Sequence, residues 1–242
     1  VAATARDGDA LLDAVGAKLD GQFLPLTVDL ADARSVQRAV DAAVTAFGGL
    51  DVVVNNAGHG LSGALDSLPD EALRGTFDIN VFGTLNVIRA ALPRLRAQRG
   101  GHVFNISSIL GFDGGSAGWG AYSAAKFAVS GLSEALALEA APHGVRVSLV
   151  YPGAMRARPH DGGHPEADRA AQGGHPVAGD PVKAARALIQ AAHAQYAPLH
   201  LFLGRDAFDQ ARGKIQSVQQ ELARWREMSV SIGFVDERRM AA

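Results

Sequence analysis

The chain has 242 residues, no cysteine and a formal net charge of −2 at pH 7. This length suits a single domain with a sizeable core, and 48% hydrophobic with 20% charged residues is a globular composition. Without cysteine there is no disulfide framework, thiolate zinc site or iron–sulfur cluster, and we expect a cytoplasmic protein. The charge predicts no nucleic-acid partner, and no apolar run has the length of a membrane span.

Short apolar runs rich in β-branched residues indicate strands. Each is too short for a helix, which is typical of strands buried on both faces in a parallel sheet. Four are clear, a fifth is weaker, and the first residues are consistent with the end of a sixth: 50–54, 103–106, 145–150, 199–203, then 23–28, then 1–5.

Helical patterns alternate with these runs. The longest pattern is interrupted by Gly75 and Gly83, and Pro93 is expected to kink its end. Strand–helix alternation predicts an α/β fold with a doubly wound parallel sheet. The expected helices are 32–47, 69–98, 121–141, 181–195 and 206–228.

Residues 155–179 break this alternation, because they are rich in Gly, His, Pro and Asp and have no apolar period. A loop of this length inside a domain is more often a lid or binding loop than an idle connection, and a surface insertion without function is the alternative. Its histidines are His160, His164 and His175. Their spacing is not helical, so we expect solvated loop residues and no metal site.

Small or polar residues follow four of the expected strands. Ligands of an open α/β sheet bind beyond the carboxyl ends of its strands, so these residues are candidates to line one crevice. Structural turns would also place Gly and Pro there. The segments are Asp29 and residues 55–58, 107–111 and 151–153.

Tyr122 and Lys126 lie four residues apart at the start of an expected helix, so both point from one face. A free tyrosine has a pKa near 10, which makes it a poor acid–base group at neutral pH. A neighbouring ammonium favours the phenolate and so lowers this pKa towards the range of acid–base catalysis. The alternative is an exposed tyrosine beside a surface lysine. Ser108, at the end of an expected strand, favours the catalytic interpretation.

The run Gly114-x-Ser116-x-Gly118 matches the nucleophile pattern of α/β-hydrolases. That motif needs a strand directly before the serine and a helix directly after it. Here Phe112 and Asp113 precede the run and further loop residues follow. We therefore expect a glycine-rich loop near the substrate rather than a serine hydrolase.

Several motifs agree in order and spacing with one family. Asn55-Asn56-Ala57-Gly58, then Asn80, Ser108 and Tyr122-x-x-x-Lys126, resemble the short-chain dehydrogenases/reductases of the larger classical type. The resemblance runs from Val1 to about Gly204. It implies one Rossmann-like domain over residues 1–242 that moves a hydride between NAD(P) and an alcohol or carbonyl carbon.

The resemblance implies a catalytic set of four residues. Tyr122 is the expected general acid for carbonyl reduction and the base for alcohol oxidation. Lys126 lowers its pKa and binds the nicotinamide ribose, and Ser108 holds the substrate oxygen. Asn80 anchors a water in a proton relay.

The cofactor contacts that the resemblance implies lie at strand ends. Arg6 follows the expected strand 1–5, where an arginine favours a 2′-phosphate, so NADP(H) is expected over NAD(H). The full set is Arg6, Asp29, Leu30, Asn56, Ala57, Gly58, Tyr122, Lys126, Pro152 and Gly153.

The chain departs from the family pattern in two places. The glycine-rich phosphate loop is absent, and the chain begins with Val1 rather than methionine, so we expect a domain lacking its first strand–loop–helix unit. Ala157 stands where a threonine is common. A non-catalytic member that senses dinucleotide or acts as a scaffold is therefore the alternative function.

The expected partners are a small-molecule carbonyl or alcohol and further copies of the chain. Substrate would enter between residues 111–120 and the loop 155–179. The resemblance implies a homodimer or homotetramer through the helices 69–98 and 121–141. The tail 206–242 packs on the substrate side or on a partner subunit, and both options stay open.

Overall fold

The computed structural model describes residues 1–16, 22–156 and 179–233. All strand pairs are parallel and fall into two sheets. The smaller sheet pairs β1 (Ala2–Ala5) with β2 (Leu24–Thr27). The larger has the order β3 (Val52–Asn55), β4 (Gly101–Ile106), β5 (Val145–Pro152) and β6 (His200–Leu203).

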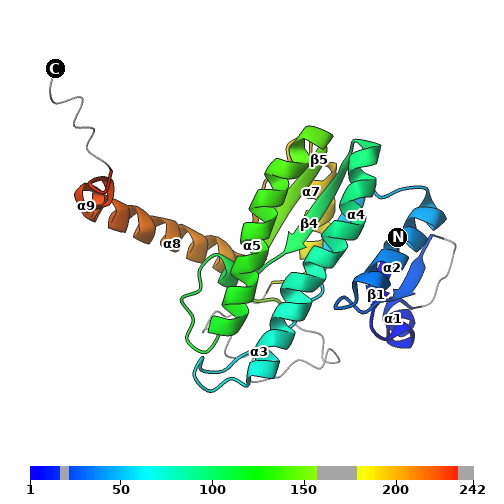
Figure 1. The fold of residues 1–242 in the computed structure, drawn as a ribbon, viewed down its shortest axis with the longest axis horizontal. Coiled ribbons are helices and arrows are strands. Elements are labelled where there is room, and N and C mark those ends of the chain that lie inside the picture. Colours follow the sequence, from blue (N-terminus) through cyan, green and yellow to red (C-terminus); the bar gives the residue numbers. More distant parts are fainter. Residues whose placement is uncertain (17–21, 157–178, 234–242) are drawn as a thin grey trace.

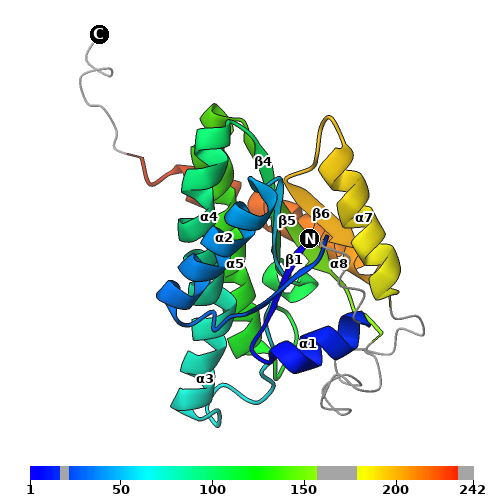
Figure 2. The ribbon, with the colours of Figure 1, turned by 90° about the vertical axis from the view of Figure 1, so that its right-hand side faces the viewer.

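Helices cover both faces of the strands, as the alternation predicts. The helices α2 (Ala33–Phe47), α4 (Thr84–Gln98) and α5 (Gly120–Ala140) lie on one face, and α7 (Pro181–His193) lies on the other (Figure 2). The other α-helices among the described residues are α1 (Gly8–Val15), α3 (Asp70–Phe77), α8 (Arg205–Arg224) and α9 (Arg226–Val230). The doubly wound α/β fold is confirmed.

The strands β4 and β5 carry the core because they are buried on both faces. Successive side chains of a strand point to opposite faces. Val103 and Val147 pack against Leu95 of α4 and Leu136 of α5. On the opposite face, Phe104 and Val150 pack against Ala191 of α7.

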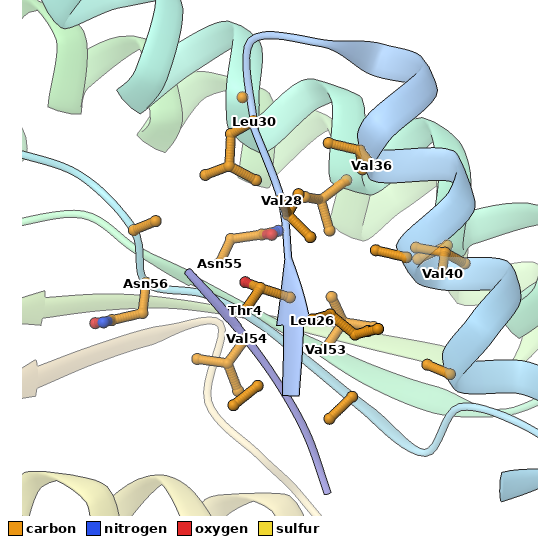
Figure 3. A pocket seen from close by; sticks show the side chains of 18 of the residues that line it. Thr4, Leu26, Val28, Leu30, Val36, Val40, Val53, Val54, Asn55 and Asn56 are labelled. Atoms are coloured by element: carbon orange, nitrogen blue, oxygen red, sulfur yellow. The ribbon is translucent and has the colours of Figure 1, made fainter. Parts of the chain in front are cut away.

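A cavity of about 490 Å³ separates β1 from β3. Thr4, Leu26, Val53 and Val54 are among the side chains around it (Figure 3). Within the described residues, no strand pairs with β1 or β3 across this cavity. The prediction that the run 50–54 is buried on both faces is wrong for β3, where Val54 is 46% exposed, because nothing described covers that face.

The expected helix 69–98 is three elements. α3 is followed by a π-helical segment, η1 (Asp78–Gly83), and then by α4, which continues through Pro93 to Gln98. A π-helical segment within α-helices is rare and is frequent at functional sites. Gly83 lies in this segment, and a Cβ there would be 3.0 Å from Leu30 Cβ.

Two further helical details were not expected. Helix α1 is short and has no long apolar period, yet the carboxylate of Asp7 caps it by accepting from the N–H groups of Asp9 and Ala10 at 3.0 and 3.1 Å. The C-terminal pattern 206–228 divides into α8 and α9 at Trp225.

Candidate active site

Tyr122 and Lys126 lie in the first two turns of α5, on the same face of the helix. The Nζ atom of Lys126 is 5.6 Å from the centre of the Tyr122 ring. Lys126 is 4% exposed, and its Nζ donates a hydrogen bond of 2.9 Å to the backbone oxygen of Ile106, at the end of β4. The sheet thus fixes the lysine beside the tyrosine.

Burial shifts the pKa of both groups. It lowers the pKa of Lys126 from 10.5 to about 8, because a desolvated ammonium is disfavoured. Burial also raises the pKa of Tyr122, and the hydrogen bond with Ser108 acts in the opposite direction. Lys126 is not among the groups that shift the pKa of Tyr122 here, so the expected lowering by this lysine stays a prediction.

Ser108 lies just beyond β4 and begins a single 3₁₀ turn, where its Oγ accepts from the N–H of Leu110 at 3.2 Å. The neighbouring Ser107 donates to the backbone oxygen of Lys126 at 3.0 Å. Ser130 of α5 donates to Gly111 O at 3.0 Å. These contacts tie the end of β4 to α5 and keep Ser108 next to Tyr122.

Asn80 lies in the π-helical segment η1 and is 1% exposed. Its amide nitrogen donates to the backbone oxygens of Thr76 and His59 at 2.9 and 3.1 Å. Its Oδ1 has no hydrogen-bond partner among the described residues. A Cβ on Gly58 would overlap this oxygen and would lie 3.4 Å from Lys126 Nζ, so Gly58 separates the two groups.

A chain of buried amides lies beneath the site. Asn55, the last residue of β3, donates to Asn105 Oδ1 of β4 at 2.7 Å. Asn105 in turn donates to Ser133 Oγ of α5 at 2.8 Å, and Ser133 donates to Val129 O. This chain joins the carboxyl ends of β3 and β4 to the middle of α5.

Ser108, Tyr122 and Lys126 line a cavity of about 220 Å³ at the carboxyl ends of β3, β4 and β5, whereas Asn80 and the amide chain do not line it. This is the edge at which ligands of an open α/β sheet bind. Lining residues come from distant segments of the chain: Asn56, Gly58, His59, Gly60, Ile106, Ser107, Ser108, Tyr122, Lys126, Pro152 and Gly153.

The other expected cofactor residues lie elsewhere. Leu30 and Ala57 line the larger cavity between the two sheets, and Asn56 lines both cavities. Arg6 is exposed and lies directly after β1. The carboxylate of Asp29 accepts a hydrogen bond of 3.0 Å from the N–H of Ala31. Neither Arg6 nor Asp29 lines either cavity. The site therefore has a compact part around Tyr122 and an open part along the ends of β1 and β2.

Sequence reasoning missed three residues of this region. His59 and Gly60 line the smaller cavity directly after the Asn55–Gly58 motif, and the continuing polar run was a usable signal. Asp206, in the first turn of α8, accepts from the N–H of Ala154 at 2.7 Å. An acidic residue at a helix start looks like an ordinary cap in the sequence.

The expected substrate loop 155–179 is described at its ends, where Met155 pairs with Gly179 and the N–H of Arg156 donates to Gly179 O at 2.9 Å. Residues 157–178, with Ala157 and the three loop histidines, lie outside the described residues. Among the residues that are described, no group of three or more His, Cys, Asp or Glu has the geometry of a metal site.

Ser116 lies in a loop turn, with its N–H donating to Gly114 O at 2.9 Å, and α5 begins at Gly120. No strand leads directly into this serine, so the hydrolase pattern lacks its structural context. None of the described helices has the length and apolar composition needed to cross a membrane.

Comparison with known proteins agrees with this geometry. A sequence model of the family described as short chain dehydrogenase matches residues 1–162. Oxidoreductase BOA17 of Botryotinia fuckeliana is 31% identical over 247 residues, covering 96% of this chain and 89% of that protein.

Two solved structures are similar over most of their length. A short-chain dehydrogenase from Streptomyces avermitilis has a TM-score of 0.86 at 36% identity, covering 96% of this chain and 89% of that one. A short chain dehydrogenase from Burkholderia cenocepacia J2315, in complex with NADP, has a TM-score of 0.74 at 27% identity, covering 93% and 85%.

The chain belongs to the short-chain dehydrogenase family. It is an NAD(P)-dependent oxidoreductase with a Rossmann-like fold, and it acts on small-molecule substrates.

Proposed function

We propose that the protein transfers a hydride between NADP(H) and a carbonyl or alcohol carbon, with Tyr122 as the general acid and base. The observation that carries this proposal is the convergence of Ser108, Tyr122 and Lys126 on one small cavity at the carboxyl ends of the strands. Tyr122 and Lys126 share one face of α5, whereas Ser108 comes from the end of β4, so the packing of strand against helix brings Ser108 to the other two.

The residues around this cavity fit the nicotinamide half of such a cofactor. Pro152 and Gly153 form one wall and Lys126 supplies a cation. Asn80 Oδ1, which bonds to none of the described residues, is a buried acceptor close by. When bound, the cofactor supplies or accepts the hydride at its nicotinamide ring. The protein contributes position and a proton.

Ser108 and Tyr122 act on the substrate oxygen. The Ser108 hydroxyl and the Tyr122 phenol lie within reach of each other, so a carbonyl oxygen placed between them would receive one hydrogen bond from each. In reduction, the Tyr122 O–H bond breaks and its proton goes to the carbonyl oxygen, which leaves a phenolate. In oxidation, the phenolate takes the alcohol proton.

Lys126 and Asn80 support this proton transfer. A phenolate beside a buried cation is favoured, since opposite charges attract strongly where water is excluded. With a pKa of about 8, Lys126 is mostly protonated at neutral pH. Asn80 Oδ1 is free to accept a hydrogen bond, which suits a water that passes a proton to or from the lysine.

The choice of NADP(H) rests on Arg6. It is exposed at the end of β1, where its guanidinium is available to a 2′-phosphate. The Burkholderia relative was solved with NADP. We expect Arg6→Ala to weaken NADPH binding by about tenfold and to leave NADH binding nearly unchanged, as measured by fluorescence titration. Arg38→Ala, an exposed arginine of α2, is the control.

Tyr122→Phe tests the catalytic assignment. This variant keeps the ring and loses the proton, so NADPH oxidation with a carbonyl panel should fall by roughly 100-fold or more while NADPH binding persists. Tyr196→Phe, at a position 85% exposed, is the matched control. Unchanged turnover in Tyr122→Phe would sink the assignment. NADPH binding by the parent protein with no turnover on any substrate would favour the dinucleotide sensor.

We also propose that the protein assembles as a homodimer or homotetramer through α4 and α5, which lie side by side (Figure 1). Phe127 and Leu138 on α5 are 44% and 80% exposed, which leaves apolar surface for a second copy. The cysteine-free composition supports a cytoplasmic location.

A further inference from the structure

Helix α8 begins on the body of the protein and then extends away from it (Figure 1). Its first turns are anchored, because Ala207 and Ala211 are buried against Ile109 and Phe202. Every described residue from 212 onward is exposed. About two thirds of this long helix thus has no covering layer among the described residues.

The extended part carries a regular apolar stripe. Large apolar residues recur at alternating intervals of three and four, which is the a/d pattern of a helix that packs along another helix. Ile215, Val218, Leu222 and Trp225 are 44%, 39%, 63% and 54% exposed. The complete stripe is Phe208, Ala211, Ile215, Val218, Leu222 and Trp225.

The stripe keeps its register across the bend at Trp225. The N–H of Trp225 donates to Glu221 O at 3.0 Å, and the N–H of Ser229 donates to Trp225 O at 2.9 Å. Helical hydrogen bonding therefore continues from α8 into α9, and Trp225 stays close to the line of the other apolar residues.

The charges of α8 and α9 argue against a lipid surface. Between residues 205 and 230 there are five Arg or Lys and four Asp or Glu, and the signs are interspersed. An amphipathic helix that binds anionic membranes has a strongly basic polar face. A nearly neutral polar face with an a/d stripe is instead suited to another helix with similar properties.

We propose that α8 pairs with α8 of a second copy of this chain, antiparallel, about a twofold axis close to Gln216 and Ser217. Antiparallel pairs match a positions with d positions. This register packs Ile215 against Val218 of the partner subunit.

The same register gives complementary charges. Lys214 and Glu221 occupy the flanking g positions, and antiparallel pairing places g against g. Lys214 therefore lies opposite Glu221 of the partner subunit, and the twofold axis repeats this ion pair. A parallel pair would instead place Glu221 opposite Arg226 of the partner subunit and leave Lys214 opposite a glutamine.

Such an interface is separate from the proposed α4–α5 face and from the active-site cavity. It joins two copies through their C-terminal helices, so an α4–α5 dimer would become a tetramer. If the α4–α5 contact does not form, α8 pairing alone would produce a dimer.

Sedimentation equilibrium of the full chain tests the proposal. Leu222→Glu places a charge in the apolar stripe, so the copies per particle should halve, or their dissociation constant should rise by at least about tenfold. Gln220→Glu adds the same charge to the outer face and should change neither. Leu222 is exposed, so folding should persist, and circular dichroism checks this.

A charge exchange tests the direction of pairing. Lys214→Glu and Glu221→Lys should each weaken assembly, and the double variant should restore it, because both ion pairs re-form with opposite polarity. An equal particle mass together with an equal dissociation constant for the parent and Leu222→Glu overturns the proposal. Failure of the double variant to recover overturns the antiparallel register. The parent chain is also tested for binding to phosphatidylcholine–phosphatidylserine vesicles. If it binds them, and Leu222→Glu loses this binding without a change in particle mass, the stripe binds a lipid surface and the proposal of α8 pairing is overturned.

Discussion

Asp206 and Ala154 join α8 to the segment that follows β5: Asp206 Oδ2 accepts a hydrogen bond of 2.7 Å from the backbone N–H of Ala154. Both carboxylate oxygens also lie against Gly153, where a Cβ would overlap them. Gly153 lines the proposed nicotinamide wall of the cavity. The position of this wall thus depends on a residue that is distant in the sequence.

Gly153→Ala should reduce activity, because the added methyl forces Asp206 or the wall to move. We expect kcat/KM to fall by roughly 10- to 100-fold, since displacements of about 1 Å at an active site have costs of this order. Gly131→Ala is the control: nothing lies within 4 Å of a Cβ at this exposed helical position. It should preserve kcat/KM and stabilise α5 slightly.

Asp206→Ala should release the same wall without adding bulk. Loss of a hydrogen bond to a charged acceptor should lower the free energy of unfolding by about 2 kcal/mol, and the KM for NADPH should rise more than kcat falls. Asp209→Ala removes an exposed carboxylate from the same helix and should leave both nearly unchanged. An unaltered KM in Asp206→Ala would contradict a positioning role. Urea unfolding and initial rates measure the two effects.

Asn105→Ala should be strongly destabilising. It breaks the amide chain and leaves the Asn55 amide and the Ser133 hydroxyl short of one partner each in the core. We expect a loss of about 2–4 kcal/mol in the free energy of unfolding, from urea titration. Asn86→Ala loses a single bond to Leu30 O at a partly buried position and should lose about 1 kcal/mol. Equal losses in the two variants would show that the buried chain of amide hydrogen bonds contributes no more to stability than one partly buried hydrogen bond.

Lys126 should make the free energy of unfolding depend on pH in the alkaline range. Its pKa is about 8 in the folded protein and near 10.5 in the unfolded chain, so between these values the unfolded chain binds more protons. The free energy of unfolding should therefore rise with pH over this window, by up to about 3 kcal/mol. Lys126→Met should lack this rise, and Lys183→Met, at an exposed site, should retain it.

His102 should make stability depend on acidic pH. Burial and the nearby Arg146 lower its pKa from 6.5 to about 4. Ser148 donates its proton to Pro198 O, so His102 Nε2 donates to Ser148, and Nδ1 is left without a described partner. Stability from the neutral imidazole should be complete above pH 6.5 and decline as pH falls towards 4. His102→Gln should flatten this decline, and the exposed His143→Gln should not; parallel curves for the parent and His102→Gln would contradict it.

Local sequence pattern predicts much of this fold, because alternation and helical periodicity reflect which side chains must avoid water. The strands around Val103 and Val147 and the shared face of Tyr122 and Lys126 follow from it. The end of each parallel strand also predicts where polar residues gather, since these ends meet at one edge of the sheet.

Tertiary packing alone decides the rest. Periodicity shows that a face is apolar, but not which distant segment covers it. Within the part of the chain that the structure describes, the exposure of β3 at Val54 and of the apolar stripe of α8 are outcomes of this kind. The contact of Asp206 with Ala154 and the burial of Asn80 Oδ1 beside Gly58 likewise arise where segments far apart in the chain meet. Such long-range contacts depend on how whole helices and strands pack together. A pattern of neighbouring residues in the sequence therefore does not predict them.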